Sequence, residues 1–82
     1  MSALGHHSYA KMIRSENRAG AKSHWQKAIE KDPLVGTFYY ELGRLELASK
    51  NEEEGKRLQS LARELDPEVD AWSIDLDFAA SE

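Results

Sequence analysis

Apolar residues recur through the middle of the chain at the spacing that lines one face of an amphipathic helix. Counted from Val35, they fall at i, i+3, i+4, i+7 and i+10. Two further segments carry shorter stripes of the same kind. The three stripes are Val35, Phe38, Tyr39, Leu42 and Leu45; Leu58, Leu61, Ala62 and Leu65; and Ala21, Trp25, Ala28 and Ile29. The pattern therefore predicts helices over most of the chain.

Helix-stop and helix-start signals divide these stripes into separate elements. Pro33 and Pro67 each follow a helix-length segment, where proline ends one helix and can open the next. Asn51 stands three residues before Glu54, which resembles a capping box at a helix start. The predicted helices cover about residues 3–14, 18–31, 34–48 and 52–65. Their short connections favour antiparallel neighbours.

The chain also repeats itself with a period of 34 residues. Asp32-Pro33 recurs as Asp66-Pro67, and residues 2–35 and 36–69 share eight identities at this offset. Random pairing over such a window gives about two. The eight pairs are Ser15/Ser49, Asn17/Asn51, Lys22/Lys56, Ala28/Ala62, Glu30/Glu64, Asp32/Asp66, Pro33/Pro67 and Val35/Val69. We predict one domain over residues 1–82, made of repeats over about 2–35 and 36–69 and a C-terminal capping helix or tail over 70–82.

This period and its residues resemble the tetratricopeptide repeat, a tandem helix-turn-helix unit. Residues 39–43, Tyr-Tyr-Glu-Leu-Gly, are similar to the aromatic-x-x-Leu-Gly pattern of the family's first helix. Further matches to small, aromatic, apolar or proline positions are Gly55, Ala62, Leu65 and Pro67 in the second unit, and Ala21, Trp25, Ala28 and Pro33 in the first. The resemblance covers roughly residues 18–72 and implies an all-α fold of antiparallel helix-turn-helix repeats, about two repeats plus a C-terminal helix.

Two positions depart from the family pattern. The first helix carries Ser8-Tyr9 where Leu-Gly is expected, and Lys50 stands at the turn position that is usually glycine.

In this family the first helix of each unit lines a concave groove that binds a peptide. Carried over by position, the resemblance implies a groove formed by His6, Ala10, Ile13, Tyr40, Glu41, Arg44, Leu47, Ala48 and Ile74. Independently, Tyr40, Arg44 and Leu47 form an i, i+4, i+7 stripe beside the core stripe, and Tyr and Arg are enriched at binding hot spots. The alternative is that Tyr40 and Leu47 complete the helix packing while the stem of Arg44 covers them.

One subclass of the family holds a partner's C-terminal carboxylate with lysine, asparagine and arginine at fixed groove positions. Those positions are occupied here by His6, Ala10, Glu41, Ala71 and Asp75. The resemblance therefore implies that this carboxylate clamp is absent, and we expect Glu41 and Asp75 to repel a ligand of that kind.

Charge is distributed unevenly along the chain. The net charge of −4 disfavours nucleic acid as a partner. Residues 1–31 hold six bases and two acids, residues 32–82 hold five bases and thirteen acids, and no base follows Asp66. The charge asymmetry suits head-to-tail association of two copies.

There is no cysteine, no membrane-length apolar run and no secretory signal in the sequence. We therefore expect a cytoplasmic protein that does not bind membranes.

Residues for catalysis or metal binding are sparse. His6 and His7 diverge by about 100° on a helix, so they do not share a metal easily, and we expect both to be solvated at a frayed N-terminus. His24 is predicted to pack, partly buried, on its helix. The chain has no H-E-x-x-H pattern, no glycine-rich phosphate loop and no G-x-S-x-G elbow. We therefore predict no enzyme activity, no cofactor and no metal.

The last segment, residues 72–78, supports two interpretations. Trp72, Ile74, Leu76 and Phe78 alternate with polar residues as in a strand, but they also have helical i, i+4 spacing. The repeat alignment favours a helix, and the alternative is an acidic-hydrophobic tail that docks on another molecule.

For the whole chain we predict an adaptor or scaffold that binds a partner's peptide segment in its groove. The alternative is a structural module that forms a homodimer through exposed repeat ends.

Overall fold

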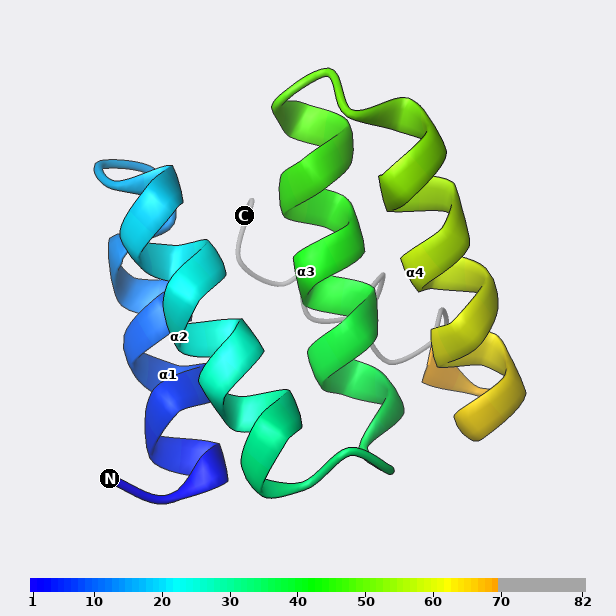
Figure 1. Cartoon of the computed structure of the whole chain (residues 1–82), viewed down its shortest axis with the longest axis horizontal. Helices are drawn as coiled ribbons and strands as arrows, with labels where there is room; N and C mark the ends of the chain where they lie inside the picture. The colour runs from blue at the N-terminus through cyan, green and yellow to red at the C-terminus, as the bar shows by residue number, and fades with distance from the viewer. Residues whose placement is uncertain (70–82) are drawn as a thin grey trace, which may run out of the picture.

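A computed structural model of the protein describes residues 1–69, and residues 70–82 lie outside the described part. Its four helices are α1 (Ala3–Ile13), α2 (Arg18–Lys31), α3 (Gly36–Ala48) and α4 (Glu52–Leu65). Consecutive helices run antiparallel, and their three connections alternate between the two ends of the molecule (Figure 1). Each helix packs on the next one in the chain. The predicted all-α fold of antiparallel helix hairpins is confirmed for these residues.

The 34-residue period is visible in the helices themselves. α2 and α4 begin 34 residues apart and also end 34 residues apart. At their C-terminal ends the Asp32 amide donates to the Ala28 carbonyl at 2.9 Å, and the Asp66 amide donates to the Ala62 carbonyl at 2.8 Å. α3 begins at Gly36, two residues later than predicted, because residues 33 and 34 form a turn. The recurring Asp-Pro pairs thus end equivalent helices.

Side-chain caps begin the first two helices but not α4. The Ser2 hydroxyl accepts from the Gly5 amide at 3.0 Å, and the Asn17 carbonyl oxygen accepts from the Gly20 amide at 2.9 Å. These contacts satisfy amides that have no partner within the helix. The predicted capping box at α4 is wrong, because the Asn51 side chain donates to Glu46 instead and caps no amide.

The turn between α3 and α4 has a backbone that favours glycine. Lys50 has a φ of 68°, and it is the one non-glycine residue of the described part with a positive φ. The left-handed region is disfavoured for side chains with a Cβ atom. Lys50 therefore occupies the turn position at which the sequence comparison expected glycine.

Two apolar clusters form the core of the described residues. The larger one surrounds Trp25, which is fully buried, and joins α2 to its neighbours. Its buried members are Ala10, Ala21, Trp25, Leu42, Leu45 and Leu58. The smaller cluster contains Tyr40, Ala62 and Val69. Tyr40 was expected outside the packed stripe, but only 8% of it is exposed, because Ala62 of α4 and Val69 after α4 pack against it.

α3 and α4 approach each other at two glycines. A Cβ atom added at Gly43 would lie 3.0 Å from the Gly55 carbonyl oxygen, and one added at Gly55 would lie 3.0 Å from the Gly43 carbonyl oxygen. Both residues are buried. The second hairpin therefore depends on small residues at this crossing.

Candidate functional site

A hollow of about 270 Å³ lies between the first hairpin and α3, near the connection from α1 to α2. It is lined by Arg14, Ser15, Arg18, Trp25, Glu41, Arg44, Leu45 and Ala48. The lining combines an apolar wall with three arginines, each from a different segment of the chain. We call it the arginine pocket.

Local sequence positions each arginine. Arg14 is the C-cap of α1, Arg18 is the first residue of α2, and Arg44 lies in α3. The Arg18 Nη1 donates to the Ala48 carbonyl oxygen at 3.0 Å. Because Ala48 is the last residue of α3, its carbonyl has no partner within that helix. This bond joins the start of α2 to the end of α3.

Glu41 is the single acidic residue of the arginine pocket, and it is held by two of the arginines. Its Oε2 accepts from the Arg14 Nη1 at 3.2 Å, and its Oε1 lies 3.6 Å from the Arg44 Nη1. The Glu41 side chain is only 7% exposed. The lining therefore contains three arginines and one glutamate, on a chain of net charge −4. The two arginines pair with the Glu41 carboxylate, and its expected repulsion of an acidic ligand stays a prediction.

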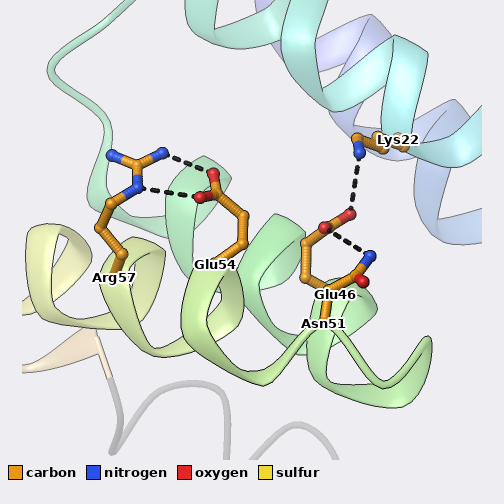
Figure 2. A network of polar contacts seen from close by, with 5 residues as sticks. All are labelled: Lys22, Glu46, Asn51, Glu54 and Arg57. Carbon is orange, nitrogen blue, oxygen red and sulfur yellow. Dashed lines mark hydrogen bonds and ion pairs between the residues drawn. The ribbon is translucent and has the colours of Figure 1, made fainter.

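A second buried glutamate ties the two hairpins together. The Glu46 Oε1 lies 3.3 Å from the Lys22 Nζ, and its Oε2 accepts from the Asn51 side-chain amide at 3.1 Å. Figure 2 shows this network beside the exposed pair of Glu54 and Arg57 on α4. The Arg57 guanidinium, by hydrogen bonding, lowers the pKa of the Glu54 carboxyl. Glu46 connects α2, α3 and the turn before α4, so we assign it a structural role.

The histidines of α1 are packed against α2 rather than solvated, which corrects the sequence-based expectation. The Nδ1 atoms of His6 and His24 lie 2.9 Å apart in a hydrogen bond, so one ring donates and the other accepts. The His7 Nδ1 accepts from the Trp25 indole N–H at 3.0 Å. Because α1 begins at Ala3, both histidines lie inside the helix instead of in a frayed end. The partly buried packing predicted for His24 is confirmed.

Both α1 histidines are easier to deprotonate than in the unfolded chain. Burial lowers the pKa of His6 below its usual 6.5, and the charges of His24 and the N-terminus lower it further. Burial, followed by the charge of Lys11, likewise lowers the pKa of His7. A neutral His7 can accept the indole proton, whereas a protonated His7 cannot. The contact with Trp25 therefore requires a neutral His7, and the contact between His6 and His24 requires that at least one of these two rings be neutral.

This requirement predicts acid sensitivity. Because the folded-state pKa values lie below 6.5, the unfolded chain binds more protons once the pH falls below 6.5. The stabilisation is complete above pH 6.5 and is lost as the pH falls through the folded-state values. The midpoint of urea unfolding should decrease between pH 7 and pH 5, and His7→Gln, which keeps an acceptor for Trp25, should show a smaller decrease. A midpoint independent of pH in the unmodified chain would contradict the prediction.

The structure places the predicted groove residues in different environments. Glu41 and Arg44 line the arginine pocket, as does Ala48. Ala10 is buried in the larger core cluster with Ile13 packed against it, and Tyr40 is in the smaller cluster. His6 is buried beside His24, and Leu47 is half-buried above Gly55. Ile74 lies outside the described residues.

Arg14 and Arg18 line the arginine pocket but were not among the sequence-predicted groove residues. Both lie at the ends of the connection between α1 and α2, where the repeat pattern assigns no groove position. The available signal was the excess of bases over acids in residues 1–31. That signal could not place them, because their contacts with Glu41 and Ala48 span 27 and 30 residues.

Comparison of the chain with protein-family models, with curated proteins and with solved structures found no match. Within residues 1–69, none of the helices has the length and apolar character needed to cross a membrane. The same residues contain no cluster of three or more histidine or acidic side chains placed to hold a metal ion.

Proposed function

We propose that the chain is a protein–protein interaction module whose arginine pocket binds an acidic and apolar peptide segment of a partner. The observation that carries this proposal is the convergence of Arg14, Arg18 and Arg44 on one hollow. Guanidinium groups form strong, directional hydrogen bonds with carboxylates, and arginine is enriched at binding hot spots. Trp25 and Leu45 are buried behind the lining, so the accessible apolar surface comes from Ala48 and from the methylene stems of the arginines, which suit a neighbouring apolar side chain.

The size of the arginine pocket favours a peptide anchor over a small molecule. At about 270 Å³ it lies at the lower end of the range of roughly 300–1,000 Å³ that is usual for drug-sized ligands, which suits one or two side chains of a peptide. Binding is also favoured over catalysis. Ser15 has no histidine beside it in the lining, and Glu41 is already held by two arginines.

The resemblance to tetratricopeptide repeats supports the same function. In that family the first helix of each unit contributes to a peptide groove, and α3 provides Glu41, Arg44 and Ala48 to the arginine pocket. The equal spacing of α2 and α4 agrees with a 34-residue unit. We therefore propose a two-repeat member of this class, acting as a cytoplasmic adaptor without cofactor, nucleic acid or membrane partners.

The proposal predicts a specific loss of binding in Arg18→Gln. The probes are two fluorescent peptides in which apolar residues alternate with either aspartate or asparagine, measured by anisotropy. The unmodified chain should prefer the aspartate peptide, and Arg18→Gln should weaken that binding about tenfold, as loss of a charge-assisted contact does. Arg57→Gln is the matched control, because it changes the net charge equally at an exposed site outside the pocket.

Two results would refute the proposed site. One is equal affinity for the aspartate and asparagine peptides, and the other is an equal effect of Arg18→Gln and Arg57→Gln. Circular dichroism should confirm that both variants remain helical at the assay temperature.

One observation favours the alternative function of self-association. Met1, just before α1, and Leu4 and Met12 within α1 are exposed large apolar residues. Repeat arrays normally present a polar outer face at their ends, and exposed apolar patches mark contact surfaces.

If this apolar surface joins two copies, light scattering should give twice the chain mass at high concentration, and Met12→Glu should restore the monomer. A monomer at all concentrations would eliminate this alternative.

A further inference from the structure

We infer that the arginine pocket binds a phosphorylated side chain of the partner, a phosphate monoester such as phosphoserine, in preference to an aspartate or a glutamate. This ligand belongs to the proposed function, on which the inference rests, and specifies the anion of the bound peptide. The number of arginines, the state of their N–H donors and the charges of the lining all favour a phosphate monoester.

The three arginines reach the pocket from three different segments. Arg14 ends α1, Arg18 begins α2, and Arg44 lies in α3. A carboxylate has two oxygens, and the Glu41 carboxylate already pairs with two guanidinium groups in this way. A phosphate monoester has three terminal oxygens that accept hydrogen bonds. It can therefore receive a donor from each of the three segments at once.

Arg14 and Arg18 keep most of their hydrogen-bonding capacity for a ligand. A guanidinium group carries five N–H donors. Within residues 1–69, Arg14 donates one hydrogen bond to Glu41 and Arg18 donates one to the Ala48 carbonyl oxygen. The Arg14 side chain is 39% exposed, and Arg18 is exposed as well. These bonds restrain the two guanidinium groups, which lowers the entropy cost of binding, and their other donors remain available.

The charges of the lining also suit a dianion. The formal charges of its three arginines and one glutamate add to +2. A phosphate monoester carries about −1.5 to −2 at pH 7, so it balances the lining almost completely. A single carboxylate balances only half of that charge. Ser15, which is exposed in the same lining, carries a hydroxyl group that can donate to a phosphate oxygen.

A phosphorylated peptide fits the pocket better than a nucleic acid does. Binding to nucleic acid neutralises many phosphates with a series of lysines and arginines. Here the arginines converge on one hollow of about 270 Å³, on a chain of net charge −4. Ala48 and the methylene stems of the arginines offer apolar surface to the residues that flank the phosphorylated side chain. A single phosphate group on a polypeptide matches all of these features.

The test uses the full-length chain and three fluorescent peptides that differ only at one central position, which holds phosphoserine, aspartate or serine. Apolar residues alternate with asparagine at the other positions. In anisotropy titrations the phosphoserine peptide should bind about tenfold more tightly than the aspartate peptide, and the serine peptide should bind most weakly, because charge-assisted hydrogen bonds increase in that order.

Two variants locate the phosphate in the arginine pocket. Arg18→Gln should weaken the phosphoserine peptide about a hundredfold and the aspartate peptide about tenfold, because a dianion loses more than a monoanion when one arginine is removed. Arg57→Gln makes the same change in net charge at an exposed site outside the pocket. This matched control should keep the affinity for the phosphoserine peptide within about twofold of the unmodified value.

The outcomes separate this inference from the proposed function. Equal affinities for the phosphoserine and aspartate peptides would overturn the phosphate preference, whereas tighter binding of the aspartate peptide than of the serine peptide would still support the proposed function. Equal losses in Arg18→Gln and Arg57→Gln would overturn the pocket as the phosphate site. Displacement of the phosphoserine peptide by an equal concentration of inorganic phosphate would overturn the assignment to a peptide. If none of the peptides binds, both the inference and the proposed function are wrong.

Discussion

Replacing Trp25 with alanine is expected to lower the free energy of unfolding by about 3–5 kcal/mol, the usual cost of removing a large buried aromatic side chain. Trp25 is fully buried at the centre of the larger core cluster, and its indole N–H donates to the His7 Nδ1 at 3.0 Å. The variant loses both the packing and the donor. Because domains of this size have small stability margins, we expect much of the chain to unfold at room temperature.

Two variants distinguish packing from the hydrogen bond. Trp25→Phe keeps an aromatic ring but removes the indole donor, so it should cost about 1–3 kcal/mol. Gln26→Ala changes the exposed neighbour on the same helix and should stay within about 0.5 kcal/mol of the unmodified chain. Urea unfolding followed by circular dichroism measures all three. A cost below about 1 kcal/mol for Trp25→Ala would mean that this residue is not the centre of the core.

Replacing Gly43 with leucine should destabilise the second hairpin by about 1–3 kcal/mol, as overpacking of a close helix crossing does. The new Cβ atom would lie 2.9 Å from the Gln59 Cγ, 3.0 Å from the Gly55 carbonyl oxygen and 3.3 Å from the Gln59 amide nitrogen. Two of these atoms belong to the α4 backbone, which cannot rotate away as a side chain can. The helices must therefore separate.

Gly5→Leu is the matched control for this effect. Its nearest atoms are the Met1 Cγ and the Ser2 hydroxyl, both on side chains at the exposed start of the chain. Met1 can move aside and the capping Ser2 hydroxyl must shift only slightly, so the free energy of unfolding should change by less than in Gly43→Leu. Thermal melts of the two variants side by side provide the measurement. Equal loss in both variants would show that the α3–α4 crossing has no special need for glycine.

Trp25 connects the core to the proposed site, because it belongs to the larger cluster and also lines the arginine pocket. Substitutions of Trp25 are therefore poor tests of binding. Arg18 is exposed and forms one hydrogen bond, to the Ala48 carbonyl oxygen, so its substitution perturbs the pocket with less effect on folding.

The sequence determined the helical elements and their period. The apolar stripe from Val35 to Leu45 depends on the 3.6-residue turn of the helix, which is a local property of the backbone. Asp32-Pro33 and Asp66-Pro67 marked the ends of α2 and α4 because proline restricts the residue before it and cannot continue the helix. The recurrence of alanine at positions 28 and 62 of the repeat indicated small residues where helices pack closely, and both alanines are buried.

Only the tertiary structure decided which polar side chains meet. Arg14 and Arg18 lie beside Glu41 and Ala48 because the first hairpin packs across α3, and no local periodicity encodes that placement. The same holds for the burial of His6 against His24 and of Tyr40 beneath Val69. A residue's helix face follows from short-range spacing, whereas its partners depend on how separate helices pack together. The sequence by itself therefore determined the helices and their repeat, and the packing of the hairpins created the arginine pocket.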